Sequence, residues 1–362
     1  MTSRMRCAPA LALLVAASLA SPARADSIKI LNVVDSNGYV FTNFDGPVPS
    51  NTAKTGTNSN GISNTGTVVG FSTPDGATFT NFTANPLTST VANPLNINGS
   101  TAAMAFGVNS AGTVVGTDGN GNAFSLSNGT VNTFIPLGGT SAMAFGINDH
   151  GLIVGQSMIS SQLVPGFIKN GSSYTTINAP TGSTSNVVNA QGINNNGLVV
   201  GFYQGNDGQV HGFMANSAVS GTLTGTPIKD PVIPVVPGEP VGTTFVFSQI
   251  LGINDQNTAV GYYGDSTLSQ HGYFYNTNTG TYTFLDDPNA AFNNGVEVTQ
   301  ITGINNSGEI TGFYSDANGV FHGFVAVAVP EPSSMALLGI GVTSVVVWAA
   351  RKRRKTTAPS LS

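Results

Sequence analysis

Short apolar runs alternate with turn-forming residues along most of the chain. LVV at 198–200 and YTFL at 282–285 are examples, and Asn, Asp or Gly residues lie near both ends of each run. Runs of this length between turn formers are typical of short β-strands joined by hairpins. No stretch between residues 26 and 329 shows the 3.6-residue apolar period of an amphipathic helix. The pattern therefore predicts an all-β domain.

A ten-residue unit recurs six times within this domain. Each copy begins with Gly, an aliphatic residue and Asn or Ser, and it closes with Gly after a mostly aliphatic pair. The copies occupy residues 61–70, 107–116, 146–155, 192–201, 252–261 and 303–312. We interpret the opening glycines, among them Gly146, Gly192 and Gly303, as structural. In the fifth copy Asn257 replaces the middle Gly, and because Asn tolerates a left-handed backbone, a turn with positive φ is predicted there.

A second motif follows three of the copies. His211, His271 and His322 each stand ten residues after the closing Gly and precede Gly and an aromatic residue. Their equivalence predicts a structural role, in which each imidazole hydrogen-bonds a neighbouring backbone group. The alternative places them around a central channel as a metal or anion site, which would require all three on the innermost strand. His150 lies in a turn and is expected to be exposed.

The repeat length predicts a six-bladed β-propeller over residues 26–328. Each unit supplies about four strands in roughly 45 residues, and such sheets must stack to bury their apolar faces. The sixth copy lacks a fourth strand, so residues 28–45 are expected to complete the last blade and close the ring. The proline-rich segment 226–241 is expected to be an extended surface insertion and not a ladder strand. A β-solenoid is the alternative fold.

The first 25 residues have the pattern of a secretory signal peptide. Arg4 and Arg6 precede the apolar run 10–20, and the small residues at 23 and 25 predict cleavage by the export machinery between Ala25 and Asp26. An uncleaved anchor is the alternative. The single cysteine precedes the apolar run, so the processed chain has no disulfide, thiolate metal site or cysteine nucleophile.

The other end, residues 329–362, combines three features in a fixed order. Pro330, Glu331 and Pro332 precede an apolar run at 335–350, which predicts a short transmembrane helix, and a basic cluster follows at 351–355. This order resembles the PEP-CTERM sorting signal of Gram-negative bacteria. The resemblance implies recognition by an exosortase, transient anchoring in the inner membrane, and release to an exopolysaccharide-rich surface. A plain single-span anchor is the alternative.

The repeats carry a second resemblance. The Gly-Ile-Asn…Val-Val-Gly unit and the His-Gly-Phe motif look like the HAF family of extracellular repeats. That likeness implies an extracellular repeat protein and no particular chemistry.

Charge narrows the possible partners. The whole chain has a net charge of −5, but residues 26–330 contain four lysines, no arginine and sixteen acidic residues, a net charge of −12. An acidic domain of this kind is not expected to bind nucleic acid. The absence of arginine also argues against enzymes that act on acidic sugars, because those enzymes neutralise substrate carboxylates with basic residues.

Catalytic and metal motifs are scarce. Asp286 and Asp287 form an adjacent acidic pair, but neighbouring strand residues point to opposite faces, whereas glycosidases need two carboxylates about 5–10 Å apart. Asp118, Asn120 and Asn122 have the alternating oxygen ligands of a calcium loop without its closing Glu, so a turn is favoured over a calcium site. No catalytic, cofactor or metal residue is predicted.

These observations predict an exported, non-enzymatic repeat protein of the exopolysaccharide or biofilm matrix, with an Asn-, Thr-, Ser- and Gly-rich surface suited to neutral glycans. The alternative is an extracellular hydrolase or lyase that acts on glycans from a propeller scaffold.

Overall fold

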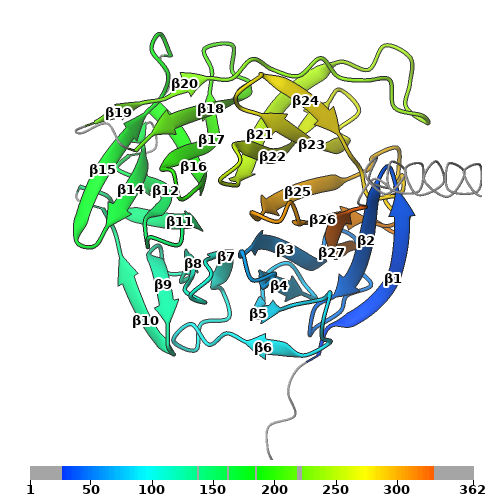
Figure 1. Ribbon diagram of the computed structural model, residues 1–362, viewed down its shortest axis with the longest axis horizontal. Coiled ribbons are helices and arrows are strands. Elements are labelled where there is room, and N and C mark those ends of the chain that lie inside the picture. Colours follow the sequence, from blue (N-terminus) through cyan, green and yellow to red (C-terminus); the bar gives the residue numbers. More distant parts are fainter. Residues whose placement is uncertain (1–26, 137, 161–162, 184–185, 218–221, 330–362) are drawn as a thin grey trace, which may run out of the picture.

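Six mainly antiparallel blades are arranged radially about one axis, as in a β-propeller (Figure 1). A single parallel pair between β27 (Phe321–Ala328) and β3 (Gly56–Ile62), Phe321 with Gly56, joins the first and last blades into one sheet. The computed structural model describes residues 27–329 apart from 137, 161–162, 184–185 and 218–221. The predicted six-bladed fold is confirmed. The signal peptide and the apolar segment 335–350 lie outside the described residues. Within those residues, none forms a helix of the length and apolarity that a bilayer span requires.

The first three blades follow one another along the chain. Blade 1 contains β3 (Gly56–Ile62), β4 (Val68–Thr73), β5 (Thr80–Ala84) and β6 (Ala92–Pro94). Blade 2 contains β7 (Met104–Val108), β8 (Val114–Thr117), β9 (Ala123–Ser127) and β10 (Thr130–Phe134). Blade 3 contains β11 (Ser141–Ile147), β12 (Ile153–Met158), β14 (Gly166–Asn170), β15 (Ser173–Asn178) and the added edge β19 (Leu223–Thr224).

Blades 4 and 5 follow the same plan. Blade 4 contains β16 (Asn186–Ile193), β17 (Leu198–Gln204), β18 (Val210–Asn216) and β20 (Thr226–Pro227), with β13 (Leu163–Val164) added beside β16. Blade 5 contains β21 (Phe245–Ile253), β22 (Thr258–Asp265), β23 (Gln270–Asn276) and β24 (Thr281–Phe284).

The two ends of the domain meet in blade 6. Its inner strands are β25 (Thr299–Ile304), β26 (Ile310–Ser315) and β27 (Phe321–Ala328), and its outer strands are β2 (Tyr39–Asp45) and β1 (Lys29–Ser36). β2 pairs antiparallel with β27 from Tyr39–Ala328 to Phe44–Gly323. The predicted closure of the ring by an N-terminal strand is therefore confirmed.

Glycines of the repeat allow the inner strands to approach one another. At Gly192 an added Cβ would lie 2.9 Å from the Leu251 carbonyl oxygen of the next blade, and at the closing Gly201 it would lie within 2.9 Å of the Phe213 ring. The opening glycines therefore permit blade-to-blade contact near the axis. The closing glycines at 116, 155, 201 and 312 also make room for the buried aromatic residue of the third strand. The middle turn residue has positive φ in every copy, including 62° at Asn257, as predicted.

The hydrophobic core lies between adjacent blades. Val200 of blade 4, for example, packs with Ile250 and Tyr273 of blade 5, and all three are fully buried. Each such side chain contributes about 1.5–3 kcal/mol by leaving water.

The proline-rich segment departs from the expectation in one respect. Its first residues form β20, which pairs with β18 through Phe213–Pro227 and Met214–Thr226 and so supplies the fourth strand of blade 4. The prediction that this segment forms no strand was therefore wrong for its first residues. An outermost strand tolerates a proline, because the N–H that proline lacks would face away from the sheet. From residue 228 to 244 the segment has no assigned strand and runs from blade 4 to blade 5.

Candidate functional site

Asparagines at the third position of the repeat connect the blades at one mouth of the central channel. Each is buried, and its Nδ2 donates to the backbone carbonyl of the equivalent residue in the next blade at 3.0–3.2 Å. Its Oδ1 accepts from the N–H four residues ahead and stabilises its own turn. These residues are Asn109, Asn148, Asn194, Asn254 and Asn305. They form a belt whose bonds are shielded from water, and Ser63 takes the sixth place.

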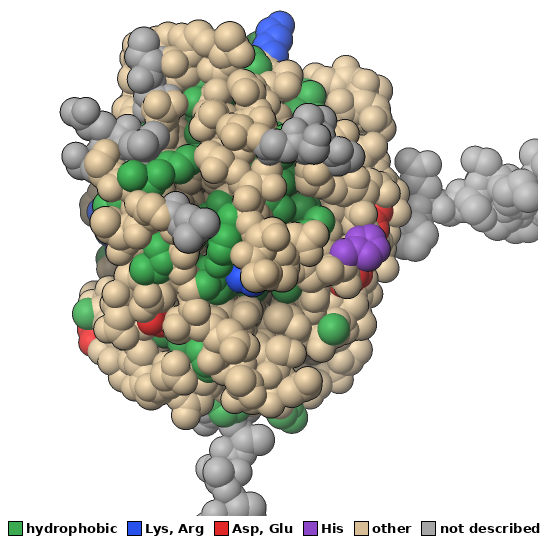
Figure 2. All heavy atoms as spheres, turned by 90° about the vertical axis from the view of Figure 1, so that its left-hand side faces the viewer, with side chains coloured by type: hydrophobic (Ala, Val, Ile, Leu, Met, Phe, Trp, Pro, Cys, Tyr) green, Lys and Arg blue, Asp and Glu red, His purple; other side chains and the backbone are tan. Residues whose placement is uncertain are grey.

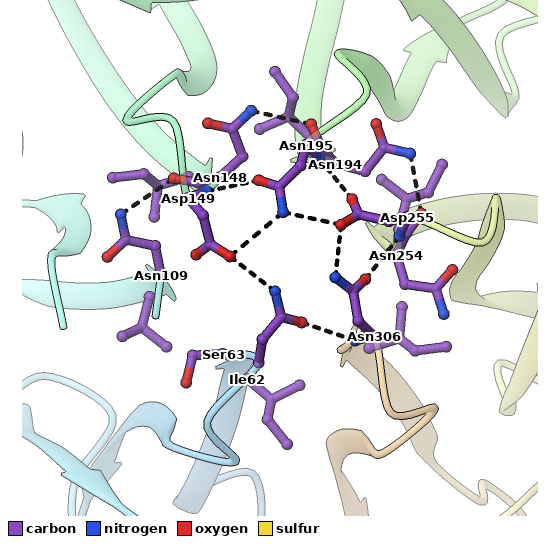
Figure 3. A pocket seen from close by; sticks show the side chains of 16 residues that line it. Ile62, Ser63, Asn109, Asn148, Asp149, Asn194, Asn195, Asn254, Asp255 and Asn306 are labelled. Atoms are coloured by element: carbon purple, nitrogen blue, oxygen red, sulfur yellow. Dashed lines mark hydrogen bonds between the residues drawn. The ribbon is translucent and has the colours of Figure 1, made fainter. Parts of the chain in front are cut away.

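The next position of the repeat forms a second ring that closes this mouth (Figure 3). Side-chain oxygens of five members accept backbone N–H groups of the preceding blade at 2.7–2.9 Å. The Asp149 carboxylate also accepts from Asn64 and Asn195, and the Asp255 carboxylate accepts from Asn195 and Asn306. Burial alone would raise the pKa of Asp149, but the hydrogen bonds from Ser110, Asn64 and Asn195 lower it.

The channel under this ring is too small for a sugar. The cavity beneath the ring measures about 60 Å³, whereas ligand pockets usually measure about 300–1,000 Å³. The asparagine and aspartate side chains that line this cavity already form hydrogen bonds between blades. The mouth is therefore a structural closure of the ring.

The three histidines lie on the third strands of blades 4, 5 and 6, away from the channel. Each Nδ1 lies 2.6–2.8 Å from an aspartate supplied from the outer side of the blade, and each Nε2 faces an aspartate of the preceding hairpin at 3.1–3.6 Å. The pairs are Asp230 and Asp207 for His211, Asp286 and Asp265 for His271, and Asp45 and Asp316 for His322. The expected backbone partners were wrong, because segments on the outer side of each blade and the preceding hairpins place carboxylates on both ring nitrogens.

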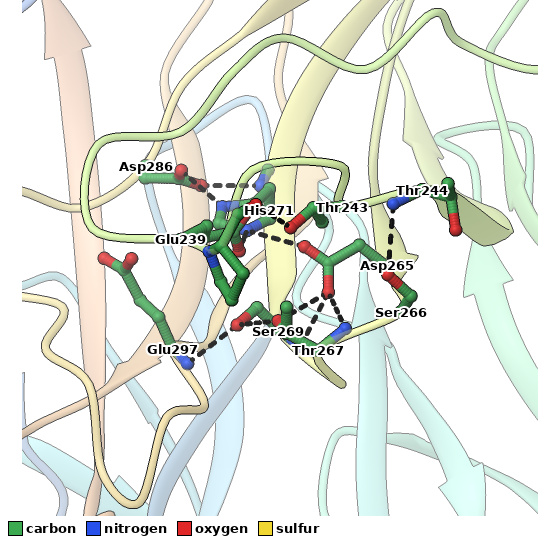
Figure 4. A network of polar contacts seen from close by, with 12 residues as sticks. Glu239, Thr243, Thr244, Asp265, Ser266, Thr267, Ser269, His271, Asp286 and Glu297 are labelled. Carbon is green, nitrogen blue, oxygen red and sulfur yellow. Dashed lines mark hydrogen bonds and ion pairs between the residues drawn. The ribbon is translucent and has the colours of Figure 1, made fainter.

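Blade 5 differs from the other two blades by one additional carboxylate (Figure 4). Glu239 lies 3.1 Å from Nε2 of His271, so Glu239 and Asp265 both face this nitrogen. All three side chains are at most 4% exposed. The ligand atoms of Glu239, Asp265 and His271 lie within 4.8 Å of one another, which is close enough for the three residues to hold one metal ion.

The electrostatics of this trio are dominated by negative charge. Burial alone would lower the pKa of His271, but Asp286 and Glu239 outweigh burial and raise it to about 9. Burial and the neighbouring Asp265 raise the pKa of Glu239. Glu297 lies nearby, and burial together with the charge of Asp286 raises its pKa as well.

The proline-rich segment supplies two of these acids. Asp230 contacts His211 of blade 4, and Glu239 contacts His271 of blade 5. The Lys229 carbonyl also accepts a hydrogen bond from the Tyr282 hydroxyl of blade 5. The segment is thus held to two blades by carboxylate–imidazole contacts, a role that its proline content did not indicate.

A pocket lies between blades 5 and 6, on the face opposite the asparagine belt, where the hairpins between second and third strands project. Its volume is about 560 Å³. Phe313 and Phe321 contribute two aromatic rings whose centroids are 5.2 Å apart. Gln270 and Gln300 lie on its wall, and Gln300 Nε2 donates to Gln270 Oε1.

The remaining lining is neutral apart from one lysine. It consists of Ala53, Lys54, Leu268, Asn293, Asn294, Val296, Val298, Ser315 and Gly319. The pocket therefore combines aromatic surface with amide donors and acceptors, and no carboxylate lines it. Such a lining can bind a polyhydroxylated ligand, but it lacks the pair of carboxylates that glycoside hydrolysis requires.

Other residues singled out from the sequence lie apart from this pocket. The Asp118 carboxylate accepts from the backbone of Asn120 and Asn122 and from the Asn122 side chain. His150 is exposed, as expected. Asp286 and Asp287 do point to different partners, His271 for the first and Asn43 for the second.

Sequence reasoning missed Glu239 and the pocket residues. Glu239 lies 32 positions before His271 in a segment without regular structure, so no local spacing indicated it. The asparagine belt did have a signal, because the third position of all six units is Asn or Ser.

Comparison with known proteins identifies the C-terminal segment. The PEP-CTERM protein-sorting motif matches residues 328–354, which confirms the sorting signal predicted there. The motif implies processing by an exosortase and export to the cell envelope or surface. The likeness of the repeats to the HAF family stays a prediction. No curated protein matches this sequence.

Solved structures with a similar fold include the beta-propeller domain of the Trilobed protease from Pyrococcus furiosus (7% identity, 86% of this chain and 98% of that chain covered, TM-score 0.39). A mutant Aleuria aurantia lectin in complex with Fucalpha1-6GlcNAc is 11% identical (76% and 97% covered, TM-score 0.40). Trypanosoma rangeli sialidase is 11% identical (93% and 60% covered, TM-score 0.37). These similarities concern the fold and say nothing of what this chain binds.

Proposed function

We propose that this chain, which carries an exosortase sorting motif, is an exported, non-enzymatic protein of the exopolysaccharide matrix, and that its propeller binds neutral glycans. The observation that carries the proposal is the pocket between blades 5 and 6. Phe321, which is half-buried and packs on the buried Phe313, offers aromatic surface for a sugar ring, and Gln270 and Gln300 offer hydrogen bonds for its hydroxyls.

Gln270 and Gln300 can bind sugar hydroxyls because the hydrogen bond between them uses only part of their hydrogen-bonding capacity. Gln300 uses one N–H to donate to the Gln270 carbonyl. Each amide has further hydrogen-bonding capacity, since a primary amide has two donors and two lone pairs. A sugar hydroxyl, which both donates and accepts, matches such a pair.

The surface composition supports a matrix role. Figure 2 shows one side of the ring, on which charged side chains are few and scattered among uncharged ones. With a net charge of −12 over residues 26–330, an anionic polysaccharide would be repelled. A neutral glycan avoids that cost.

The binding experiment uses the exported protein and neutral polysaccharides, including the exopolysaccharide of its own host. Calorimetry should detect binding, and Phe321→Ala should weaken it at least about tenfold, equivalent to roughly 1.4 kcal/mol. Phe79 is the matched control, because it pairs with Phe71 in blade 1 as Phe321 pairs with Phe313 but does not line the pocket. Unchanged binding by Phe321→Ala would contradict the assignment, and glycan turnover would favour the hydrolase or lyase alternative.

The processing step has its own test. Intact-mass measurement of the protein released by the host should give a start at Asp26 and an end near Pro330. If the full-length chain were the only form, exosortase processing would be refuted.

A further inference from the structure

The acids around His271 outnumber its one positive charge, and two of them, Glu239 and Asp265, are buried. Asp286 lies at its Nδ1, while Glu239 and Asp265 face its Nε2. A protonated imidazole supplies one positive charge against three carboxylates, and buried charge without a counter-ion costs several kcal/mol. The equivalent histidines of blades 4 and 6 each face two carboxylates and are more exposed.

The Asp265 carboxylate, which faces the same histidine, has an unsatisfied oxygen. Asp265 is 2% exposed, and its Oδ2 has no hydrogen-bond partner. Its other oxygen, Oδ1, accepts from Thr267 and from the Ser269 backbone, which fixes the orientation of the carboxylate. Oδ2 is thereby held 3.6 Å from Nε2 of His271.

The spacing of these atoms suits a small divalent ion. Two ligands bound at about 2.0–2.1 Å to a tetrahedral Zn²⁺ lie about 3.4 Å apart. Nε2 of His271 lies 3.1 Å from Glu239 Oε1 and 3.6 Å from Asp265 Oδ2, on either side of that value. The contact between Nδ1 and Asp286 resembles the carboxylate–histidine pair that orients metal-bound imidazoles.

We propose that Glu239, Asp265 and His271 bind one divalent ion of the Zn²⁺ class and that this ion fastens the 228–244 segment to blade 5. The imidazole, which releases its Nε2 proton to solvent as the ion binds, and the two carboxylates supply three ligands, and water completes the fourth position. A hard ion such as Ca²⁺ is disfavoured, because it takes six to eight oxygen ligands. The proposal is independent of glycan binding, since none of the three residues lines the pocket.

The experiment measures zinc in the full chain, expressed in an exporting host and purified without a polyhistidine tag. After chelation, addition of Zn²⁺ and dialysis, elemental analysis should find one zinc per chain. Co²⁺ in its place should give the strong visible absorption of a tetrahedral site. Glu239→Gln and Asp265→Asn should each abolish both signals, and Asp286→Asn should lower zinc affinity about 10–100-fold.

His322→Gln is the matched control, because His322 has the same two aspartate contacts but no counterpart of Glu239, and it should leave the zinc content at one. Circular dichroism would show that each variant is folded. A folded wild-type protein that keeps no zinc, a Glu239→Gln variant that keeps one, or an equal loss in His322→Gln would overturn the proposal.

Discussion

Blades 5 and 6 are built from the same motif and differ in what surrounds it. In blade 6 His322 lies between Asp45 and Asp316, and its ring contacts that of Tyr314 at a tilt of 36°. In blade 5 His271 lies between Asp286 and Asp265, and its ring contacts that of Tyr263 at a tilt of 32°. The second cluster contains one more carboxylate, Glu239, and its histidine is 1% exposed, whereas His322 is 14% exposed. The presence of Glu239, which belongs to a segment outside the repeat, is thus the difference between the candidate metal site at His271 and the structural ion pair at His322.

The two blades should respond alike where their packing is alike. Tyr273 and Phe324 are fully buried, and each stands opposite the closing glycine of its unit in the strand pairing. Substitution of either by Ala should lower the free energy of unfolding by about 3–5 kcal/mol, measured by urea denaturation. Val33→Ala, at a position 62% exposed, should change it by less than about 0.5 kcal/mol. A large effect in only one blade would argue against their equivalence.

A polar bond distinguishes the two aromatic positions. The Tyr273 hydroxyl donates to the Gln249 carbonyl at 3.0 Å and lies 2.8 Å from Ser248 Oγ, whereas Phe324 has no such group. Tyr273→Phe should therefore cost about 1–3 kcal/mol by leaving buried partners unsatisfied. Tyr275→Phe is the control in the same blade and should cost less than about 0.5 kcal/mol. Equal costs for both variants would show that the Tyr273 bond is unimportant.

The blade 6 cluster should make stability depend on pH. Burial alone would lower the pKa of His322, but Asp45 and Asp316 outweigh it and raise the pKa. A histidine whose pKa is raised by folding stabilises fully below its unfolded value of about 6.5, and the contribution disappears as the pH rises through the folded value. The cost of His322→Gln should thus be about 1–3 kcal/mol near pH 5 and shrink in alkaline buffer.

Urea denaturation over a pH series measures this difference. His150→Gln, at an exposed turn position, is the control and should leave the pH dependence as in the wild type. A cost of His322→Gln that grows as the pH rises would have the wrong sign for the ion pair.

The smallest effect concerns the hairpins before the histidines. In blades 4 and 6 the residue with positive φ is Gly208 or Gly319, whereas in blade 5 it is Leu268, at φ 74° and 74% exposed. Because a side chain in this conformation costs about 1 kcal/mol, Leu268→Gly should raise the free energy of unfolding by roughly 0.5–1 kcal/mol. Thermal denaturation would show it, and a loss of stability would mean that the Leu268 side chain makes a necessary contact.

The sequence predicted most of the fold because the fold is periodic. The turns with positive φ, the blade count and closure by residues 28–45 all follow from six aligned copies. Partners of the histidines were not predictable in this way. Asp45 and His322 are 277 positions apart and meet only because the ring closes, and Glu239 lies in a segment that aligns with no repeat. The pocket likewise combines residues near 54, 270, 293 and 321, none of which belongs to the ten-residue unit.

Anomalous X-ray diffraction at the zinc absorption edge tests the difference between the blades most directly. Crystals of the exported protein equilibrated with Zn²⁺ should show one strong peak between Glu239, Asp265 and His271, and no comparable peak beside His211 or His322. Absence of the blade 5 peak, or peaks of equal height at all three histidines, would contradict the conclusion that Glu239 creates a metal site in blade 5 alone.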